Sequence, residues 1–393
     1  IRLILVKITK IYFLIIFISV GFSLYLSEVY LNYKKDSNSI NILKKQKIYK
    51  KEKNKDFDIR SKSQIYEDMS ENDPNITSEA SPSLFNDPDK KLFFLNGISK
   101  SKTISCNENG YYSIYQSDRY GFNNPDKEWD EKEIEYLLVG DSFTAGSCVN
   151  RPNDITSILR ILSNKSALNL GYKGNGPLAS YATLKEYKPK KIKNILWLYF
   201  EGNDLSNLEA ELGKKILKNY FFNENFNQNL NQKQEYIDIQ NQKLTSMHLK
   251  KQDEAINYYK KNSALKYKLL KFIRLDKTKK KIKSFLKKKE KELPIQEFEN
   301  ILFRTKELAA INNSNFYFIY LPQYERYTQK INNKNYTNVR SIIKKLNINF
   351  IDLHEELFIK EKNPLELFPF KMWGHYNELG YKKVAEKIYL NLK

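Results

Sequence analysis

Short runs of β-branched and other large apolar residues recur along the C-terminal two-thirds of the chain, and most are separated by segments with the apolar period of a helix. The apolar runs predict five strands, at 134–139, 167–170, 195–200, 315–320 and 348–351. The periodic segments predict helices at 142–161, 177–186, 295–311, 337–346 and 377–392. Such alternation is typical of a mostly parallel sheet with helices on both faces, so we expect an α/β domain over 134–393.

One block interrupts this alternation. Residues 213–292 are rich in Lys, Gln and Asn, and they carry 22 basic and 8 acidic side chains. Their pattern predicts a long, basic, mainly helical insertion. A solvated arm is the simplest interpretation. The alternative is a lid or a docking surface for anionic lipid or polymer, with its highest charge density at 277–291.

The N-terminal end contains the one continuously apolar stretch of the sequence. Residues 11–27 carry no charge and follow Arg2, Lys7 and Lys10, which is the pattern of a signal peptide or a signal anchor. The absence of an Ala-x-Ala-like cleavage site favours an uncleaved transmembrane anchor over 1–32. A short basic head before one apolar run is the usual export geometry, so we expect a membrane-anchored, extracytoplasmic protein rather than a secreted one.

Two segments with different patterns connect the anchor to the α/β domain. Residues 33–90 are charged, rich in Ser and Asn, and lack apolar periodicity, which predicts a disordered linker. Residues 91–133 contain aromatic pairs and a tight polar run at 117–126. They predict an ordered, loop-rich lead-in that packs on the domain.

Composition excludes several classes of protein. The chain has 393 residues, 41% of them hydrophobic, which is enough for a substantial core. A net charge of +21 suggests nucleic acid, anionic lipid or acidic polysaccharide as a partner. The excess of Lys, Asn, Ile and Tyr is also what an AT-rich genome would produce. The insertion has no motif that reads nucleic acid, so we expect no nucleic-acid partner. Two cysteines and three histidines are too few for a four-ligand zinc site of Cys or for a disulfide scaffold, and we expect neither a metal site nor a cofactor.

Polar and glycine-containing blocks follow the first three predicted strands, and another precedes the last predicted helix. They are Gly140-Asp-Ser-Phe-Thr-Ala-Gly146, Gly171-Tyr-Lys-Gly-Asn-Gly-Pro177, Glu201-Gly-Asn-Asp204 and Trp373-Gly-His-Tyr-Asn-Glu-Leu-Gly-Tyr381. Ser142 would lie at a helix N-terminus, where a serine often serves only as a cap. Because parallel strands end at one edge of a sheet, we expect the four blocks to converge into one site.

The four blocks resemble those of the SGNH (GDSL-type) hydrolase superfamily, matching at Gly140-Asp-Ser142, Gly174, Gly202-Asn203-Asp204 and His375. The resemblance covers about 134–393 without the insertion. It implies a flavodoxin-like three-layer α/β/α sandwich and ester chemistry, with Ser142 as nucleophile and His375 as base. It also implies an oxyanion hole made by the backbone N–H groups of Ser142 and Gly174 and the side-chain amide of Asn203.

One position departs from the family pattern. The family places an Asp three residues before the His, but this chain has Met372 there. The carboxylate that would orient the imidazole is therefore missing from its expected position. A backbone carbonyl could orient His375 in a dyad, and Glu366 and Asp352 are substitutes between which the sequence does not decide. His354, at the end of another predicted strand, is an alternative base.

The two cysteines of the chain, Cys106 and Cys148, suggest a disulfide. Cys148 lies six residues after Ser142, and an exported chain would meet an oxidising compartment. A bridge between them would tie the lead-in to the edge of the sheet that carries Ser142. The sequence does not show whether their Cα atoms come within reach of each other.

These features predict a membrane-anchored serine esterase or O-acyltransferase that acts on an ester, in the first place an acetyl ester, of a cell-envelope carbohydrate. Hydrolysis and transfer share the acyl-enzyme and differ in whether water or a sugar hydroxyl accepts the acyl group. The expected partners are an acylated carbohydrate or another small ester, the membrane through the N-terminal helix, and anionic lipid or polymer at the insertion. The alternative is a catalytically inactive carbohydrate-binding or scaffold protein that retains the fold.

Overall fold

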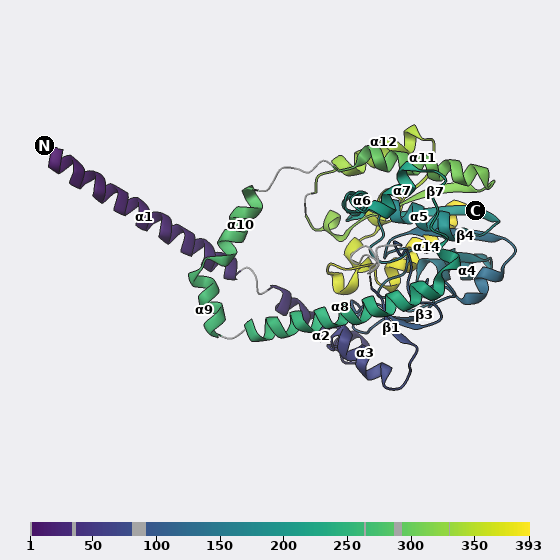
Figure 1. The fold of residues 1–393 in the computed structure, drawn as a ribbon, viewed down its shortest axis with the longest axis horizontal. Coiled ribbons are helices and arrows are strands. Elements are labelled where there is room, and N and C mark those ends of the chain that lie inside the picture. The colour runs from purple at the N-terminus through teal and green to yellow at the C-terminus, as the bar shows by residue number, and fades with distance from the viewer. Residues whose placement is uncertain (1, 34–36, 81–91, 263–264, 287–292, 330) are drawn as a thin grey trace. The chain divides into compact units, whose positions relative to one another are not determined.

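The computed structural model describes residues 2–33, 37–80, 92–262, 265–286, 293–329 and 331–393. The chain divides into two compact units (Figure 1). The first unit consists of Ile1–Lys55 and Lys251–Glu292, and the second of Asp56–Lys250 and Leu293–Lys393. The α/β domain predicted over 134–393 lies in the second unit, except for residues 251–292 of its insertion, which belong to the first.

A five-stranded parallel sheet forms the centre of the second unit. Its strands are β4 (Ile134–Gly140), β5 (Ala167–Asn169), β6 (Ile192–Phe200), β7 (Asn315–Leu321) and β8 (Asn349–Asp352). They pair in the order β5-β4-β6-β7-β8, and every pair is parallel. This is the strand order of flavodoxin-like folds, so the predicted fold class is confirmed. The order reverses at β4, and ligands of such sheets bind outside the carboxyl ends of the strands at this reversal.

Helices cover both faces of this sheet, because alternate residues of each buried strand point to opposite sides. On one face, Leu137 and Trp197 share a core with residues of α5 (Pro177–Tyr187), α11 (Ile295–Ile311) and α12 (Lys334–Lys345). On the other face, Leu138 and Leu196 share a core with residues of α4 (Ile155–Ser163) and α14 (Glu378–Leu392). The result is a three-layer sandwich, as predicted.

The helix predicted at 142–161 begins only at Ile155. The residues before it form a tight turn, in which the N–H of Ser147 donates to the carbonyl of Ser142 at 3.0 Å. Gly146 has φ +74°, and a Cβ there would lie 2.4 Å from the Cβ of Asp154. Asp154 in turn caps α4 by accepting from the N–H of Ser157. The close packing of this turn on the cap therefore ends the helix earlier than the apolar period suggests.

Part of the segment expected to be a disordered linker is ordered. Helix α2 (Ser37–Lys53) belongs to the first unit, whereas α3 (Lys62–Ser70) and strand β1 (Ile76–Ser78) belong to the second. Strand β1 joins β2 (Lys102–Ile104) and β3 (Ile114–Gln116) of the lead-in in a small sheet. A local core of Ile65, Ile76 and Ile104 holds these elements together, although three isolated isoleucines give no periodic signal in the sequence. Residues 81–91 lie outside the described part of the chain.

The insertion is mainly helical where the structure describes it. Its helices are α7 (Lys215–Phe222), η4 (Leu230–Gln232), α8 (Gln234–Asn262), α9 (Leu265–Ile273) and α10 (Asp276–Leu286), and α6 (Asp204–Leu212) precedes them. Residues 287–291, part of the stretch with the highest predicted charge density, lie outside the described residues. The remaining short helices are η3 (Asp126–Asp130), η5 (Tyr324–Tyr327), α13 (Leu353–Glu356), η6 (Phe358–Lys360), η7 (Pro364–Leu367) and η8 (Pro369–Lys371).

The first unit begins with the long apolar helix α1 (Arg2–Tyr33). Its segment Lys10–Tyr33 has a mean hydropathy of 1.9 and is long and apolar enough to cross a bilayer. A signal sequence near the N-terminus would meet the same criteria.

Candidate active site

Ser142 lies in the turn that follows β4, at the carboxyl edge of the sheet. Gly140 ends the strand with φ +155°, and a Cβ there would lie 2.2 Å from Thr144 Oγ1 and 2.6 Å from the carbonyl oxygen of Leu198. Only glycine therefore lets the chain leave the strand in this way. Asp141 stabilises the turn, since its Oδ1 accepts from the N–H of Phe143 at 2.9 Å. Ser142 itself is 8% exposed.

His375 meets Ser142 although 233 residues separate them, with its Nε2 atom 2.9 Å from Ser142 Oγ. The chain directly after His375 is held in place by its neighbours. Tyr376 is fully buried and donates its hydroxyl to the carbonyl of Pro322 at 2.7 Å. Asn377 caps α14, with its Oδ1 accepting from the N–H of Gly380 at 2.8 Å. The imidazole is thus presented from the start of the last helix to the serine at the end of β4.

Glu108 of the lead-in faces the other nitrogen of this imidazole. Both of its carboxylate oxygens lie 3.2 Å from His375 Nδ1, and Oε2 also accepts from the backbone N–H of His375 at 2.6 Å. Gly374 makes this approach possible, because a Cβ there would lie 2.6 Å from Glu108 Oε2. A carboxylate in this position holds Nδ1 as the donor and leaves Nε2 free to accept a proton.

This geometry corrects the alternatives that the sequence left for orienting His375. The orienting group is neither a backbone carbonyl nor one of the two carboxylates considered. Glu366 is exposed and forms an ion pair with Lys371 at 3.0 Å. Asp352 caps α13 and accepts from the hydroxyl of Tyr336 at 2.7 Å. No sequence signal marks Glu108, because it precedes His375 by 267 residues and lies in a loop without a motif.

The charge on Glu108 also affects the protonation of His375. Burial by itself lowers the pKa of His375, but the Glu108 carboxylate raises it by charge and by hydrogen bonding, and Asp141 raises it further. The net direction of the pKa shift is upward. Asp141 is itself buried, and this burial raises the pKa of its carboxyl to about 6. The site therefore stabilises an imidazolium that would form when His375 takes a proton.

A disulfide connects the loop of Glu108 to the turn of Ser142. Cys106 and Cys148 are bonded, with their Cα atoms 4.8 Å apart. The side chain of Asn109 adds a hydrogen bond to the carbonyl of Cys148 at 2.9 Å. Cys148 Sγ lies 3.7 Å from His375 Nδ1. The two sulfurs and the imidazole are close enough together to suggest a metal site, but sulfurs bonded to each other are not thiolate ligands.

Gly174 and Asn203 line the same pocket as Ser142 and His375, and this pocket has a volume of about 440 Å³. Gly174 follows β5 and has φ +80°, a conformation that favours glycine. Asn203 stands between β6 and α6, and its Oδ1 is buried without a hydrogen-bond partner among the described residues. All four sequence blocks therefore contribute to one pocket at the reversal of strand order, between β4 and β6.

Aromatic and polar side chains form the rest of the pocket wall. Phe143 stacks on Phe200 with ring centroids 3.9 Å apart, and its ring lies 4.7 Å from that of His375. Trp373 lines the pocket and is 67% exposed. The remaining wall residues are Lys173, Gly202, Asn207, Gln323, Tyr324, Glu325 and Gly374. The wall thus combines apolar ring surface with hydrogen-bonding groups of both kinds.

A buried ion pair supports the segment 323–325 of this wall. Glu201 follows β6 and pairs with Arg326, and their side chains are only 7% and 6% exposed. Arg326 Nε donates to Glu201 Oε2 at 2.8 Å, and the N–H of Gln323 donates to the same oxygen at 3.2 Å. Removing one partner of such a pair leaves a buried charge without its counterion, which is strongly destabilising.

His354, the alternative base, does not line this pocket. Its Nδ1 lies 2.9 Å from the hydroxyl of Tyr327, and its ring packs edge-on against Tyr336. Burial and the positive charge of Arg326 lower the pKa of His354. It is a partly buried histidine with a structural hydrogen bond.

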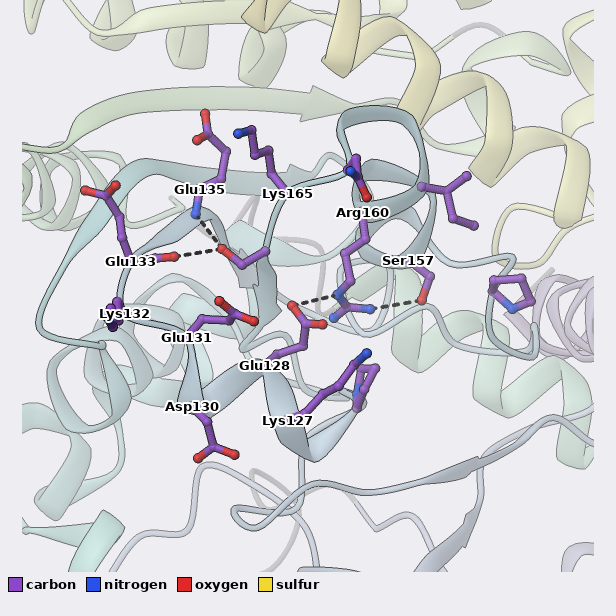
Figure 2. Close-up of a pocket in the computed structure, with 15 residues that line it drawn as sticks. Lys127, Glu128, Asp130, Glu131, Lys132, Glu133, Glu135, Ser157, Arg160 and Lys165 are labelled. Carbon is purple, nitrogen blue, oxygen red and sulfur yellow. Dashed lines mark hydrogen bonds and ion pairs between the residues drawn. The ribbon is translucent and has the colours of Figure 1, made fainter.

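A larger pocket, of about 980 Å³, lies elsewhere in the second unit (Figure 2). Its walls come from the residues before β4 and β5, so it is at the amino edge of the sheet, opposite to Ser142. Figure 2 shows that Arg160 of this pocket contacts Glu128 and Ser157. Arg160 Nε lies 3.5 Å from Glu128 Oε2, and Arg160 Nη1 donates to Ser157 Oγ at 3.2 Å. None of the four sequence blocks contributes to it. Size alone therefore does not make this pocket the candidate active site.

No family model matches the chain, and no curated protein matches it in sequence. Solved structures similar to it include a Desulfitobacterium hafniense protein assigned to the G-D-S-L family of lipolytic proteins, at 15% identity over 66% of this chain and 99% of that chain, with a TM-score of 0.34. An acetyl xylan esterase, AlAXEase, is similar at 12% identity over 66% and 100% of the two chains, with a TM-score of 0.36. An acetylxylan esterase from Geobacillus stearothermophilus is similar at 11% identity over 66% and 94%, with a TM-score of 0.35. Such low identities and TM-scores do not indicate the activity of this chain. Its activity has to be inferred from its own residues.

Proposed function

We propose that this protein is a serine hydrolase or acyltransferase that acts on an ester. Ser142 is the nucleophile, His375 the general base and Glu108 the positioning carboxylate. The observation that carries the proposal is the continuous chain of contacts from Ser142 Oγ to His375 Nε2, at 2.9 Å, and from His375 Nδ1 to Glu108, at 3.2 Å. A nucleophile within hydrogen-bond reach of a base that a third group orients is the arrangement that activates a serine.

The proposed reaction begins when Ser142 Oγ attacks the ester carbonyl carbon and its proton passes to His375 Nε2. The negative charge that develops on the carbonyl oxygen is stabilised by the N–H groups of Ser142 and Gly174 and by the amide of Asn203. The alkoxide of the substrate then leaves, taking the proton from His375, and the acyl group stays on Ser142. Water or a sugar hydroxyl then attacks the acyl carbonyl carbon and gives its proton to His375 Nε2. The bond between the acyl group and Ser142 Oγ breaks, and Oγ takes the proton back from Nε2.

For the substrate, we infer an acylated carbohydrate carrying a small acyl group such as acetyl. The support is the pocket wall, which includes both the exposed Trp373 and the polar side chains of Lys173, Asn207 and Gln323. Indole and phenol rings offer flat apolar surface with a polar tip, and a sugar offers both apolar faces and hydroxyl groups. An envelope location follows if α1 anchors the chain in a membrane with the second unit outside the cytoplasm.

The alternative of an inactive scaffold protein loses one of its two supports. These are the absence of a carboxylate three residues before His375, where the sequence has Met372, and the large insertion. Glu108 now occupies the place at Nδ1 that such a carboxylate would take.

The test is the reaction of Ser142 with a fluorophosphonate probe, combined with turnover of p-nitrophenyl acetate. The wild-type protein should be labelled once, at Ser142, and should release p-nitrophenol. Ser142→Ala should abolish labelling and lower kcat by about 10³ or more, since the acyl-enzyme route is lost. An unchanged circular dichroism spectrum would show that the variant is folded. Full turnover by folded Ser142→Ala would refute the proposal.

A further inference from the structure

In the first unit, two helices of the insertion pack against the C-terminal end of α1 (Figure 1). The side chain of Glu28 in α1 is fully buried, and its carboxylate accepts from the backbone N–H of Thr278 at 2.7 Å and from that of Lys277 at 3.2 Å. These are N–H groups of the first turn of α10, which have no partner within the helix. Lys277 Nζ donates in return to the carbonyl of Leu31 at 3.3 Å. Glu28 thus caps α10 and fixes it to α1.

Helix α9 reaches the same end of α1. The hydroxyl of Tyr25 donates to the carbonyl of Ile273 at 3.0 Å, and the ring of Tyr25 lies 5.7 Å from that of Phe272. Further toward the N-terminus, the apolar side chains of α1 are exposed, among them Phe13 at 75% and Phe17 at 79%. The contacts with the insertion therefore involve residues 25–31, at the C-terminal end of the uncharged run 11–27 that is suited to a bilayer core and just past it.

The outer surfaces of α9 and α10 combine apolar and basic side chains. The exposed apolar residues are Leu269, Leu270, Ile273 and Ile282, and the exposed basic residues are Lys268, Arg274, Lys279, Lys280, Lys281 and Lys283. In α9, Leu269, Leu270 and Ile273 recur at helical spacing, and in α10 the exposed Ile282 stands among exposed lysines. Helices with an apolar stripe and a basic face lie in the interface of anionic membranes.

We propose that α9 and α10 form a membrane collar, a basic surface that binds anionic phospholipid headgroups where α1 leaves the bilayer. Three observations meet in this assignment. The apolar run of α1 ends where the collar begins, the collar is attached there through Glu28, and its exposed charge is complementary to an anionic leaflet. This surface lies outside the candidate active site and does not depend on the proposed function.

The test places a fluorescent label on the collar of the full-length protein in lipid nanodiscs. Both natural cysteines are in the disulfide, so Ile282→Cys provides a single free thiol for an environment-sensitive dye. Nanodiscs of phosphatidylcholine alone are compared with nanodiscs that contain phosphatidylglycerol. Since α1 inserts in both, a difference reports on the collar. In the anionic discs we expect a blue-shifted emission and at least about threefold stronger quenching by a shallow spin-labelled lipid, both reduced in 1 M salt, where the Debye length falls to about 3 Å.

A matched control carries the label at Ile161→Cys, an exposed position (65%) on α4 of the second unit, where neither lipid should change the emission. The charge variant Lys279→Gln/Lys280→Gln/Lys283→Gln, labelled at 282, should respond to the anionic discs as to the neutral discs. A label at 282 that stays in water in both discs, or is quenched equally in both, would overturn the proposal. Polyglutamate that shifts the emission in neutral discs, without any effect of phosphatidylglycerol, would also overturn it and assign the surface to an acidic polymer.

Discussion

At the residue scale, the contact of Glu108 with His375 leads to a prediction about both rate and pH. Glu108→Gln removes the charge but retains a hydrogen-bonding group, so kcat should fall by about 10² to 10⁴ while KM changes little. In the wild-type protein, burial lowers the pKa of His375, whereas the charges of Glu108 and Asp141 raise it. The net shift of this pKa is upward. The base must be neutral to act, so activity rises with pH through this pKa. Without the carboxylate the pKa falls, and the ascending limb of kcat/KM should move to lower pH.

The measurement is a pH series of kcat/KM on a soluble ester for wild type and Glu108→Gln. Glu366→Gln is the matched control, because that carboxylate is exposed and forms an ion pair with Lys371 rather than with His375. It should leave both rate and limb unchanged. Met372→Asp should also have little effect, because Glu108 already occupies Nδ1. A limb that stays in place in Glu108→Gln would mean that another group sets the pKa of His375.

The site residues show which signals a sequence carries and which it lacks. Ser142, Gly174, Asn203 and His375 stand directly beside predicted strands and helices, so their convergence follows from the parallel sheet. Glu108 stands in a loop between short strands, and its partner is 267 residues away. The one local trace is Cys106, two residues before Glu108, whose bond to Cys148 links this loop to the turn of Ser142. The disulfide predicted from the two cysteines therefore points to the loop that contains Glu108, but it does not identify Glu108 itself.

At the element scale, the disulfide should matter for catalysis because it ties the lead-in loop to the Ser142 turn. With Cys106→Ser/Cys148→Ser, Glu108 should spend less time against His375, and kcat should fall by about 10-fold to 10² with the ascending pH limb shifted down as in Glu108→Gln. Reduction of the wild-type disulfide by a phosphine should have the same effect. The readout is kcat/KM against pH, with circular dichroism as the control for folding.

A double-mutant cycle separates this role from general stabilisation of the fold. If the disulfide acts through Glu108, its loss should cost almost nothing in the Glu108→Gln background. Equal rate losses in both backgrounds would show that the disulfide acts on the site by another route. The cycle also distinguishes a positioning role from a redox role of the sulfurs themselves.

Element boundaries could be predicted where apolar periodicity alone decides them. The predicted boundaries were wrong where close packing decides them. The strands and the helices α5, α11 and α14 begin and end within a few residues of their predicted bounds. The helix predicted from 142 begins at Ile155, because Gly146 packs against the cap at Asp154 and Cys148 has φ +67° in its disulfide. Likewise, β1 to β3 have three residues each, too few for a period to appear in the sequence.

At the scale of the whole molecule, the alternation of strands and helices was enough to predict the α/β class, because a parallel sheet requires crossovers and helices on both faces. The strand order came only from the resemblance of the four blocks, since periodicity does not say which strand neighbours which. The two compact units could not be predicted either. The first unit combines residues from the N-terminus with residues beyond position 250, and only contacts such as that of Glu28 with Thr278 define it.

This division leads to a prediction about the whole chain. Every residue of the candidate site, Ser142, Glu108, Gly174, Asn203 and His375, lies in the second unit. A protein that lacks residues 1–55 and has 251–292 replaced by a short Gly/Ser linker should therefore fold and turn over a soluble ester with kcat/KM within about threefold of wild type, because loops of this kind add little entropy cost. It should at the same time fail to sediment with phosphatidylglycerol vesicles, which the full chain should do. Normal folding with loss of activity on the soluble ester would show that the first unit contributes to catalysis, and retained vesicle binding would move the lipid contact to the second unit.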